Sequence, residues 1–267
     1  MIESTFLFLP GIAAVRERQL WSGGILAWRT FLEAGRILRI SQTWKTHYDE
    51  LVKAAQEQHQ KDKPRWFAPR LRPREHWRLY EWLRPRTVFL DIETAGPFGE
   101  ITVVGLFGQG RMVQLVRGET LTEARLGEHL SQYDLLVTFN GAGFDLPCLR
   151  AQFPRLALDQ AHLDLRFAGR ALEWKGGLKQ VERLAGIERP IGIDGLDGWD
   201  AVRLWNQWRR GHDPAALERL LAYNAADCVN LEPLADLLYC GLRERCGLDG
   251  FLDHKRPALS RATSGGL

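Results

Sequence analysis

Two acidic side chains stand close together at the end of an apolar run, in the tetrapeptide Asp91-Ile92-Glu93-Thr94. Residues i and i+2 of a strand face the same side, so Asp91 and Glu93 would project together. Neighbouring carboxylates repel one another unless a proton or a metal ion lies between them. The tetrapeptide therefore predicts either a metal site or an ordinary strand end that reaches solvent.

A third acid follows a second apolar run, in Asn140-Gly141-Ala142-Gly143-Phe144-Asp145. The glycines allow a sharp turn and a close approach of the backbone to a ligand. Asp145 then falls in the first turn of the predicted next helix. There it could serve a ligand, or it could simply complement the positive end of the helix dipole.

A fourth acid lies in Tyr223-Asn224-Ala225-Ala226-Asp227, within a long helical pattern. Residues i and i+4 share one helical face, so the phenol and the carboxylate can converge on one point. The alternative is a half-buried tyrosine next to a capping or surface aspartate.

Taken together, the patterns DxE, NxxxFD and YxxxD resemble, in this order, the DnaQ-like family of 3′–5′ exonucleases, in its tyrosine-bearing (DEDDy) branch. The resemblance covers about residues 87–240 and is nearest to the YprB-like bacterial ribonuclease H-like proteins. It implies an α/β fold with a ribonuclease H-like mixed sheet, in which three antiparallel strands precede a βαβ unit and helices flank the sheet.

The resemblance also implies two Mg²⁺ or Mn²⁺ ions, held by Asp91, Glu93, Asp145 and Asp227. Hard divalent ions prefer carboxylate oxygens, and a pair of them can activate water and stabilise a phosphoryl transition state. Asp91, Glu93 and Asp227 would hold the ion that activates water, and Asp91 and Asp145 would position the second. Tyr223 would orient the water, because a phenol with a pKa near 10 is a poor base at neutral pH.

Contacts to the substrate are expected from Thr94, Asn140 and Phe144 by the same resemblance. Lys175 and Lys179 flank a Gly-Gly pair at a predicted helix start, whose free N–H groups could receive a phosphate. The alternative is a glycine-marked helix start with solvated lysines.

Other residues with chemical potential are expected to be structural. His162 and Asp164 share one face of a short predicted strand and have no third ligand in view. The tryptophans at positions 199, 205 and 208 follow a helical pattern and are expected to pack in the core.

Charge is distributed unevenly along the 267 residues, whose net charge is +3. Residues 1–87 hold 16 basic and 9 acidic side chains, whereas residues 88–267 hold 20 and 24. A basic arm next to an acidic body suggests a surface for a polyanion. We expect the protein to bind nucleic acid and not to bind a membrane.

The most basic segment, residues 61–86, has nine Lys/Arg, three acids and four prolines. The prolines rule out one continuous helix, so we expect an extended connector with at most a helical turn. Its arginines alternate with five aromatic residues, a composition used for binding single strands. Alternatively, the segment wraps on the acidic body with its aromatic side chains in the core.

Residues 1–60 have a helical pattern with a Pro10-Gly11-Ile12 turn and a Gly23-Gly24-Ile25 turn. These turns resemble a degenerate helix-hairpin-helix, a module that contacts nucleic-acid phosphates, although a helical pair that only packs on the nuclease would look the same. The expected organisation is therefore a helical region (1–60), the basic connector (61–86), the exonuclease domain (87–252) and a disordered tail (253–267).

Within the exonuclease domain, alternation and turn residues predict strands and helices in a definite order. The expected strands are 87–93, 100–107, 110–116, 134–140 and 162–165. The expected helices are 119–132, 143–153, 177–185, 198–210 and 214–238.

Several protein classes are excluded. No apolar run is long enough to span a membrane, and the four cysteines form no CxxC pair, so we expect a cytoplasmic protein in a reducing compartment.

The predicted function is a metal-dependent 3′–5′ exonuclease that releases nucleoside monophosphates from single-stranded or frayed ends. DNA is preferred because the arm resembles a DNA-binding hairpin. The alternatives are an exoribonuclease with the same site and a catalytically idle nucleic-acid-binding adaptor module.

Overall fold

The computed structural model describes residues 1–97 and 99–253, which form two compact units. One unit comprises Met1–Lys61 and the chain from Arg243 onward, and the other comprises Asp62–Leu242. Except for Asp253, the tail predicted to be disordered lies outside the described residues.

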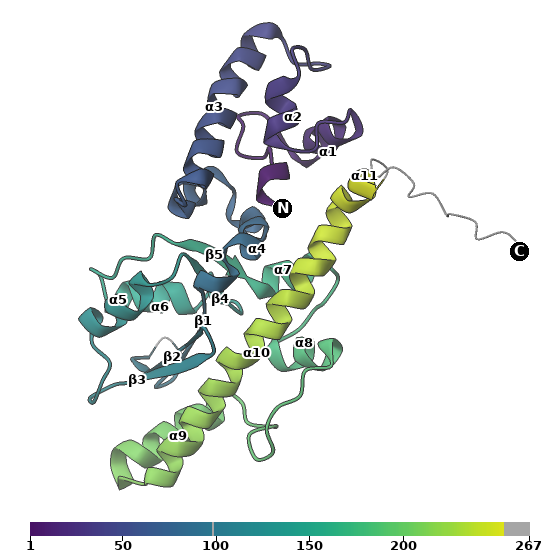
Figure 1. The fold of residues 1–267 in the computed structure, drawn as a ribbon. Coiled ribbons are helices and arrows are strands. Elements are labelled where there is room, and N and C mark those ends of the chain that lie inside the picture. Colours follow the sequence, from purple (N-terminus) through teal and green to yellow (C-terminus); the bar gives the residue numbers. More distant parts are fainter. Residues whose placement is uncertain (98, 254–267) are drawn as a thin grey trace, which may run out of the picture. The chain divides into compact units, whose positions relative to one another are not determined.

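A five-stranded mixed sheet forms the centre of the larger unit (Figure 1). Its strands are β1 (Thr87–Thr94), β2 (Ile101–Gly108), β3 (Arg111–Val116), β4 (Leu135–Thr138) and β5 (Ala161–Asp164). The order is β3-β2-β1-β4-β5, antiparallel from β1 to β3 and parallel from β1 through β4 to β5. The predicted α/β fold, with three antiparallel strands followed by a βαβ unit, is confirmed.

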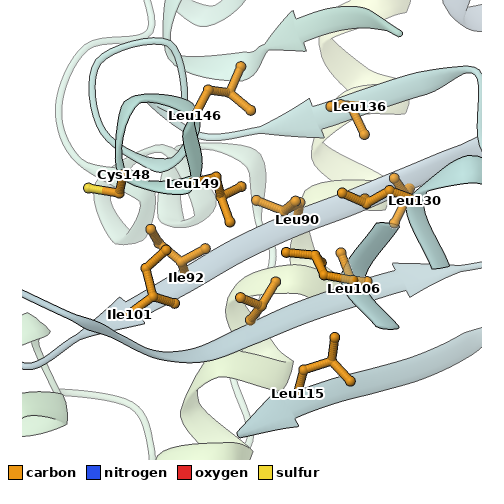
Figure 2. Close-up of a cluster of buried hydrophobic side chains, with 13 residues drawn as sticks. Leu90, Ile92, Ile101, Leu106, Leu115, Leu130, Leu136, Leu146, Cys148 and Leu149 are labelled. Carbon is orange, nitrogen blue, oxygen red and sulfur yellow. The ribbon is translucent and has the colours of Figure 1, made fainter. Parts of the chain in front are cut away.

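Helices α5 (Glu123–Ser131) and α6 (Asp145–Gln152) cover one face of the sheet. Figure 2 shows the apolar cluster between them and the strands, with Leu90 and Ile92 of β1 pointing into it. Since side chains alternate along a strand, Asp91 and Glu93 must point to the opposite face.

Helices α9 (Gly198–Gly211) and α10 (Pro214–Cys246) contribute to a second apolar cluster on that opposite face. Val103 of β2 belongs to this cluster and pairs directly with Glu93. Residues paired across antiparallel strands share a face, so the two acids of β1 lie on the side of α10. The sheet is covered on both sides, which buries Glu93 and leaves Asp91 half-buried.

The first two helices after β5 are α7 (Leu165–Ala171) and α8 (Leu178–Ala185). The sequence pattern predicted α8 but not α7. Helix α10 contains an internal proline, Pro233, and continues eight residues beyond its predicted end at Leu238.

The basic segment is not extended, which corrects the prediction. It folds as the short helices η2 (Pro64–Trp66), η3 (Ala68–Arg70), η4 (Pro73–Leu79), α4 (Tyr80–Leu83) and η5 (Arg84–Arg86). Each of the four prolines occupies the first or second position of one short helix. A proline is tolerated there because its fixed φ suits the turn and its missing N–H has no partner to lose.

The same segment packs on the sheet domain and buries three of its five aromatic residues, whereas Trp66 and Trp82 are half-buried. Phe67, Trp77 and Tyr80 are buried, which excludes them from stacking on bases. The ring of His76 accepts a hydrogen bond from the backbone N–H of His162, on the edge strand β5 (3.0 Å). Arg65 pairs with Asp159 of the body (2.8 Å). These contacts favour the alternative in which the segment wraps on the acidic body.

In the smaller unit, the described helices are η1 (Ile2–Ser4), α1 (Ala14–Ser22), α2 (Trp28–Glu33), α3 (Gln42–Gln60) and α11 (Leu248–Asp253). The turn at Pro10-Gly11-Ile12 is preceded by the short helix η1 and not by an α-helix. The turn at Gly23-Gly24-Ile25 joins α1 to α2. The buried Trp28 indole donates a hydrogen bond to the Thr5 carbonyl oxygen (2.8 Å). Binding of nucleic acid by this unit stays a prediction.

Among the described residues, no helix combines the length and the apolar character that crossing a bilayer requires.

Candidate metal centre

Three carboxylates converge where β1 meets α10. Asp91, Glu93 and Asp227 each place one oxygen within 4.8 Å of the others. Oε1 of Glu93 is buried and has no hydrogen-bond partner among the described residues. A buried acceptor without a donor requires an explanation, and a hard cation that takes oxygen ligands would supply one. The donor set thus fits Mg²⁺ or Mn²⁺.

Asp145 lies next to this cluster at the start of α6. Its Oδ1 accepts a hydrogen bond from the backbone N–H of Ile92, between the two acids of β1 (3.2 Å). Asp145 does not belong to the group of three, so the structure places it beside Asp91, Glu93 and Asp227 and not among them. Its position in the first helical turn also complements the dipole of α6.

The pKa values of the clustered acids are raised. Burial is the largest cause for Asp91 and Glu93, followed by the negative charge of Asp227. Burial also raises the pKa of Asp145 to about 7, against the lowering effect of the Ile92 N–H. Burial and mutual repulsion both disfavour the ionised forms, and a bound cation would offset both costs.

Tyr223 lies one helical turn before Asp227 and is also buried. The Lys179 ammonium lies 5.1 Å from the centroid of its ring, and the Arg189 guanidinium lies 5.9 Å from it. Burial, followed by the charge of Asp227, raises the pKa of the phenol. Tyr223 therefore stays neutral and can donate or accept a hydrogen bond, but it is not a base.

Asn224 also belongs to the candidate centre, although the sequence pattern gave it no role. Its fully buried amide donates to Oδ2 of Asp91 (3.0 Å), and its oxygen accepts from the Gln114 side chain (3.0 Å). The contact with Asp91 joins α10 to β1 and fixes the carboxylate. The only feature of the sequence that pointed to Asn224 was that it is a polar residue in a mostly apolar stretch.

Gly105 makes this contact possible, because it lies on β2 opposite Asp91. A Cβ at Gly105 would lie 2.2 Å from Oδ1 of Asn224 and 2.6 Å from Sγ of Cys228. Asn224 cannot move away without losing its hydrogen bonds to Asp91 and Gln114. Only glycine thus allows α10 to approach the sheet this closely.

We expect Gly105→Ala to lower the free energy of unfolding by about 1–3 kcal/mol, the usual cost of overpacking. It should also weaken Mn²⁺ binding, because α10 carries Asp227. Urea unfolding and calorimetric titration with Mn²⁺ would measure the two effects. The matched control is Gly127→Ala on α5, where a Cβ meets only an ordinary contact at 3.6 Å. Equal stability of the two variants would contradict the expected close packing.

Arg189 was not predicted as a site residue either, because the sequence around it has no periodic pattern. Its Nη2 donates to Oδ1 of Asp227 (2.5 Å), and its Nε donates to Oε2 of Glu182 (2.7 Å). Asn230 of α10 donates to Oε1 of the same glutamate (2.9 Å). This buried network holds Asp227 in one orientation, and the charge of Arg189 lowers the pKa of Asp227 against the effect of burial.

The residues predicted to contact substrate lie in different surroundings. Thr94 is buried and donates to the Gly96 carbonyl oxygen (2.9 Å), whereas Phe144 packs against the apolar core. Asn140 has a positive φ of 69°, and its Oδ1 accepts from Arg166 (2.6 Å). Lys175 is exposed. Of the five, Lys179 is the one that contacts a residue of the candidate centre, through the ring of Tyr223.

His162 and Asp164 have structural partners, as expected. The carboxylate of Asp164 accepts hydrogen bonds from the backbone N–H groups of Asn140 (2.8 Å) and Ala142 (3.0 Å). A ring nitrogen of His162 lies 2.8 Å from the Thr138 hydroxyl, and burial lowers the pKa of His162 to about 4. Asp164 therefore shapes the turn that leads to Asp145.

The prediction of core packing for the tryptophans of α9 was wrong in one position. Trp205 is buried and Trp208 packs against the second apolar cluster, but the ring of Trp199 is 61% exposed. Trp199 lies in the first turn of α9.

Comparisons with known proteins bear on the domain that holds this centre. Residues 88–239, more than half of the chain, match the family model described as the RNase_H superfamily. Among solved structures, the chain is similar to the crystal structure of the Aedes aegypti Nibbler EXO domain. That similarity covers 67% of this chain and 91% of that chain, at 16% sequence identity and a TM-score of 0.38. No curated protein matched the sequence significantly.

Proposed function

Because the chain belongs to the RNase_H superfamily, we propose that it is a metal-dependent 3′–5′ exonuclease. The observation that carries the proposal is the convergence of Asp91, Glu93 and Asp227 within 4.8 Å, with a buried oxygen of Glu93 that lacks a donor among the described residues. Such a cluster, in which Glu93 and Asp227 are buried, is costly for the fold without a cation. Its geometry is explained most simply by phosphodiester hydrolysis.

Two ions, Mg²⁺ or Mn²⁺, would be held by the four acids Asp91, Glu93, Asp145 and Asp227. When bound, such ions supply Lewis acidity that activates water and offsets the charge of the reacting phosphate. The acids themselves must be ionised to act as ligands, so metal binding would release protons from groups whose pKa values are raised.

The remaining residues would orient the reactants. The neutral phenol of Tyr223 can accept a hydrogen bond from the attacking water and fix its direction. Asn224 holds the Asp91 carboxylate in place through a 3.0 Å hydrogen bond. Lys179, above the ring of Tyr223, could donate to a substrate phosphate. Thr94, Asn140, Phe144 and Lys175 stay candidates for contacts with the terminal nucleotide.

The substrate would be a single-stranded or frayed 3′ end, from which nucleoside monophosphates are released. We favour DNA on the resemblance of the N-terminal glycine turns to a DNA-binding hairpin. An exoribonuclease with the same site is the nearest alternative, and an idle binding module is the alternative from another class. A reducing, cytoplasmic location would suit the four cysteines, which are all free.

One experiment separates these functions. The purified protein is incubated with Mn²⁺ and with 5′-labelled single-stranded DNA or RNA, alongside Asp227→Ala and the exposed control Asp159→Ala. A ladder that shortens from the 3′ end with wild type and Asp159→Ala, but not with Asp227→Ala, would support the proposal. Binding without metal-dependent cleavage of either polymer would instead indicate the idle module.

A further inference from the structure

A surface depression of about 370 Å³ adjoins the candidate metal centre on the side of Tyr223 and Asp227. Three cationic side chains line it, Lys179 and Arg183 of α8 and Arg189 of the following segment. Arg183 has no contact with the clustered acids in the described part of the chain, and Arg189 holds Asp227 and Glu182 with two of its three side-chain nitrogens. Their gathering next to the carboxylates raises the question of which anion they serve.

The start of α8 lines the same depression through Gly177, Leu178 and Lys179. The residue before the helix is Gly177, and no side chain caps the first turn. The first N–H groups of a helix have no intrahelical acceptor, and the helix dipole adds partial positive charge there. The helix start therefore adds donors and partial positive charge to the three side chains.

Arg189 provides an independent indication of a ligand. Its side chain is only 4% exposed, and its Nε and Nη2 atoms bond to Glu182 and Asp227. Its third nitrogen, Nη1, is buried and has no hydrogen-bond partner among the described residues. Leaving a charged donor buried and unpaired is costly, so an acceptor is expected to complete the set.

The acids that line the depression are already engaged. Asp197 accepts hydrogen bonds from the backbone N–H groups of Trp199 and Asp200 and so caps α9. Asp227 belongs to the carboxylate cluster and is paired with Arg189. Both negative charges have partners, and Arg183 uses its Nε to donate to the Lys179 carbonyl oxygen (3.2 Å), so its other nitrogens can donate to an anion from outside.

We propose that this depression is a subsite for a phosphate of the substrate strand, adjacent to the phosphate that reacts at the carboxylates. The inference rests on the proposed function and names a second anchor for its substrate. Phosphate oxygens are the acceptors that guanidinium groups and helix starts bind best. Tyr223 and Asp227 border both the depression and the candidate centre, so one strand can reach both.

The test compares two variants that each remove one exposed arginine of the same unit. Arg183→Gln alters the depression, whereas Arg210→Gln alters α9 at a position that does not line it. Binding of a 5′-fluorescent single-stranded oligonucleotide is measured by polarisation in EDTA over a range of salt concentrations, so that no turnover is required. Thermal unfolding of each variant verifies that it is folded.

We expect Arg183→Gln to bind roughly ten-fold more weakly, as for the loss of one charge-assisted contact. The slope of log K against log salt should become shallower by about 0.7, the value for one phosphate on a single strand. Arg210→Gln should retain the slope of wild type. Identical slopes for Arg183→Gln and Arg210→Gln would overturn the subsite.

Hydrolysis in Mn²⁺ separates the subsite from the proposed function. If wild type degrades the oligonucleotide, Arg183→Gln should raise KM roughly ten-fold with little change in kcat, because the contact lies beyond the reacting phosphate. If wild type does not hydrolyse either polymer, the nuclease proposal fails while the difference in binding still supports a strand-phosphate subsite. Inorganic phosphate could instead displace the strand more than chloride does at equal ionic strength, while Arg183→Gln keeps the slope of wild type. This combined result would identify a pocket for a free anion and overturn the proposal.

Discussion

Replacing Asp91 by Asn should lower the rate of hydrolysis at least about 10³-fold, since losing a shared metal ligand removes several kcal/mol of transition-state stabilisation. The same change should make the metal-free protein more stable. Burial and the charges of Asp227 and Glu93 raise the pKa of Asp91, so its ionised form opposes folding. Asparagine has nearly the same shape and carries no charge.

The sign of this stability difference depends on pH. An acid whose pKa is raised in the folded state favours folding below its unfolded pKa, and this contribution is lost as the pH rises through the folded value. In EDTA, the stability gain of Asp91→Asn over wild type should therefore grow as the pH rises from about 4, near the unfolded pKa of an aspartate. Thermal unfolding across this range measures the gain.

Added Mn²⁺ should reverse the order of stability. A ligand that binds only the folded state stabilises it according to its concentration and affinity, and Asp91→Asn should lose most of this effect. Asp159→Asn is the control, because Asp159 is exposed, pairs with Arg65 and does not belong to the cluster. Full activity of Asp91→Asn, or equal stabilisation of both variants by Mn²⁺, would disprove the assignment of Asp91 as a metal ligand.

Arg189→Met should destabilise the protein by about 3–5 kcal/mol, the cost of removing one partner from a buried ion pair. Glu182 is only 2% exposed, and its carboxylate would lose its cation. Arg65→Met is the control, because Arg65 is 41% exposed and its pair with Asp159 should contribute no more than about 1 kcal/mol. Urea unfolding of the two variants gives the comparison.

A double variant tests whether the loss comes from the unpaired charge. Adding Glu182→Leu to Arg189→Met removes the stranded carboxylate and should restore part of the lost stability, because apolar replacement of a whole buried pair is often tolerated. Activity should stay low, since Asp227 would no longer be held by Nη2 of Arg189. A double variant less stable than Arg189→Met would show that packing, not charge, dominates this network.

Much of the fold could be predicted from local patterns. The alternation in residues 87–116 predicted the three antiparallel strands within one or two residues, and the glycine-rich turn after β4 predicted the start of α6. Alternation along β1 also predicted that Asp91 and Glu93 share a face. These features depend on neighbours in sequence, where the periods of 2 and 3.6 residues are visible.

The short helices of residues 62–86 could not be predicted in the same way. Prolines and arginines indicated a break in regular structure, but their first-turn positions depend on the packing of Phe67, Trp77 and Tyr80 against the body. Composition alone fits both an exposed, base-stacking segment and a wrapped one. Burial decided between them.

By itself, the sequence predicted the kind of chemistry. The acids of β1, the turn before Asp145 and the Tyr223/Asp227 pair resemble, in their order and spacing, the motifs of a family of metal-dependent exonucleases. Only the tertiary structure decided which side chains complete the site. Asn224 reaches Asp91 across 133 residues, and Arg189 reaches Asp227 across 38. Such contacts have no local period or turn signal, because they form only when α10 packs over Gly105 and the acids become buried together.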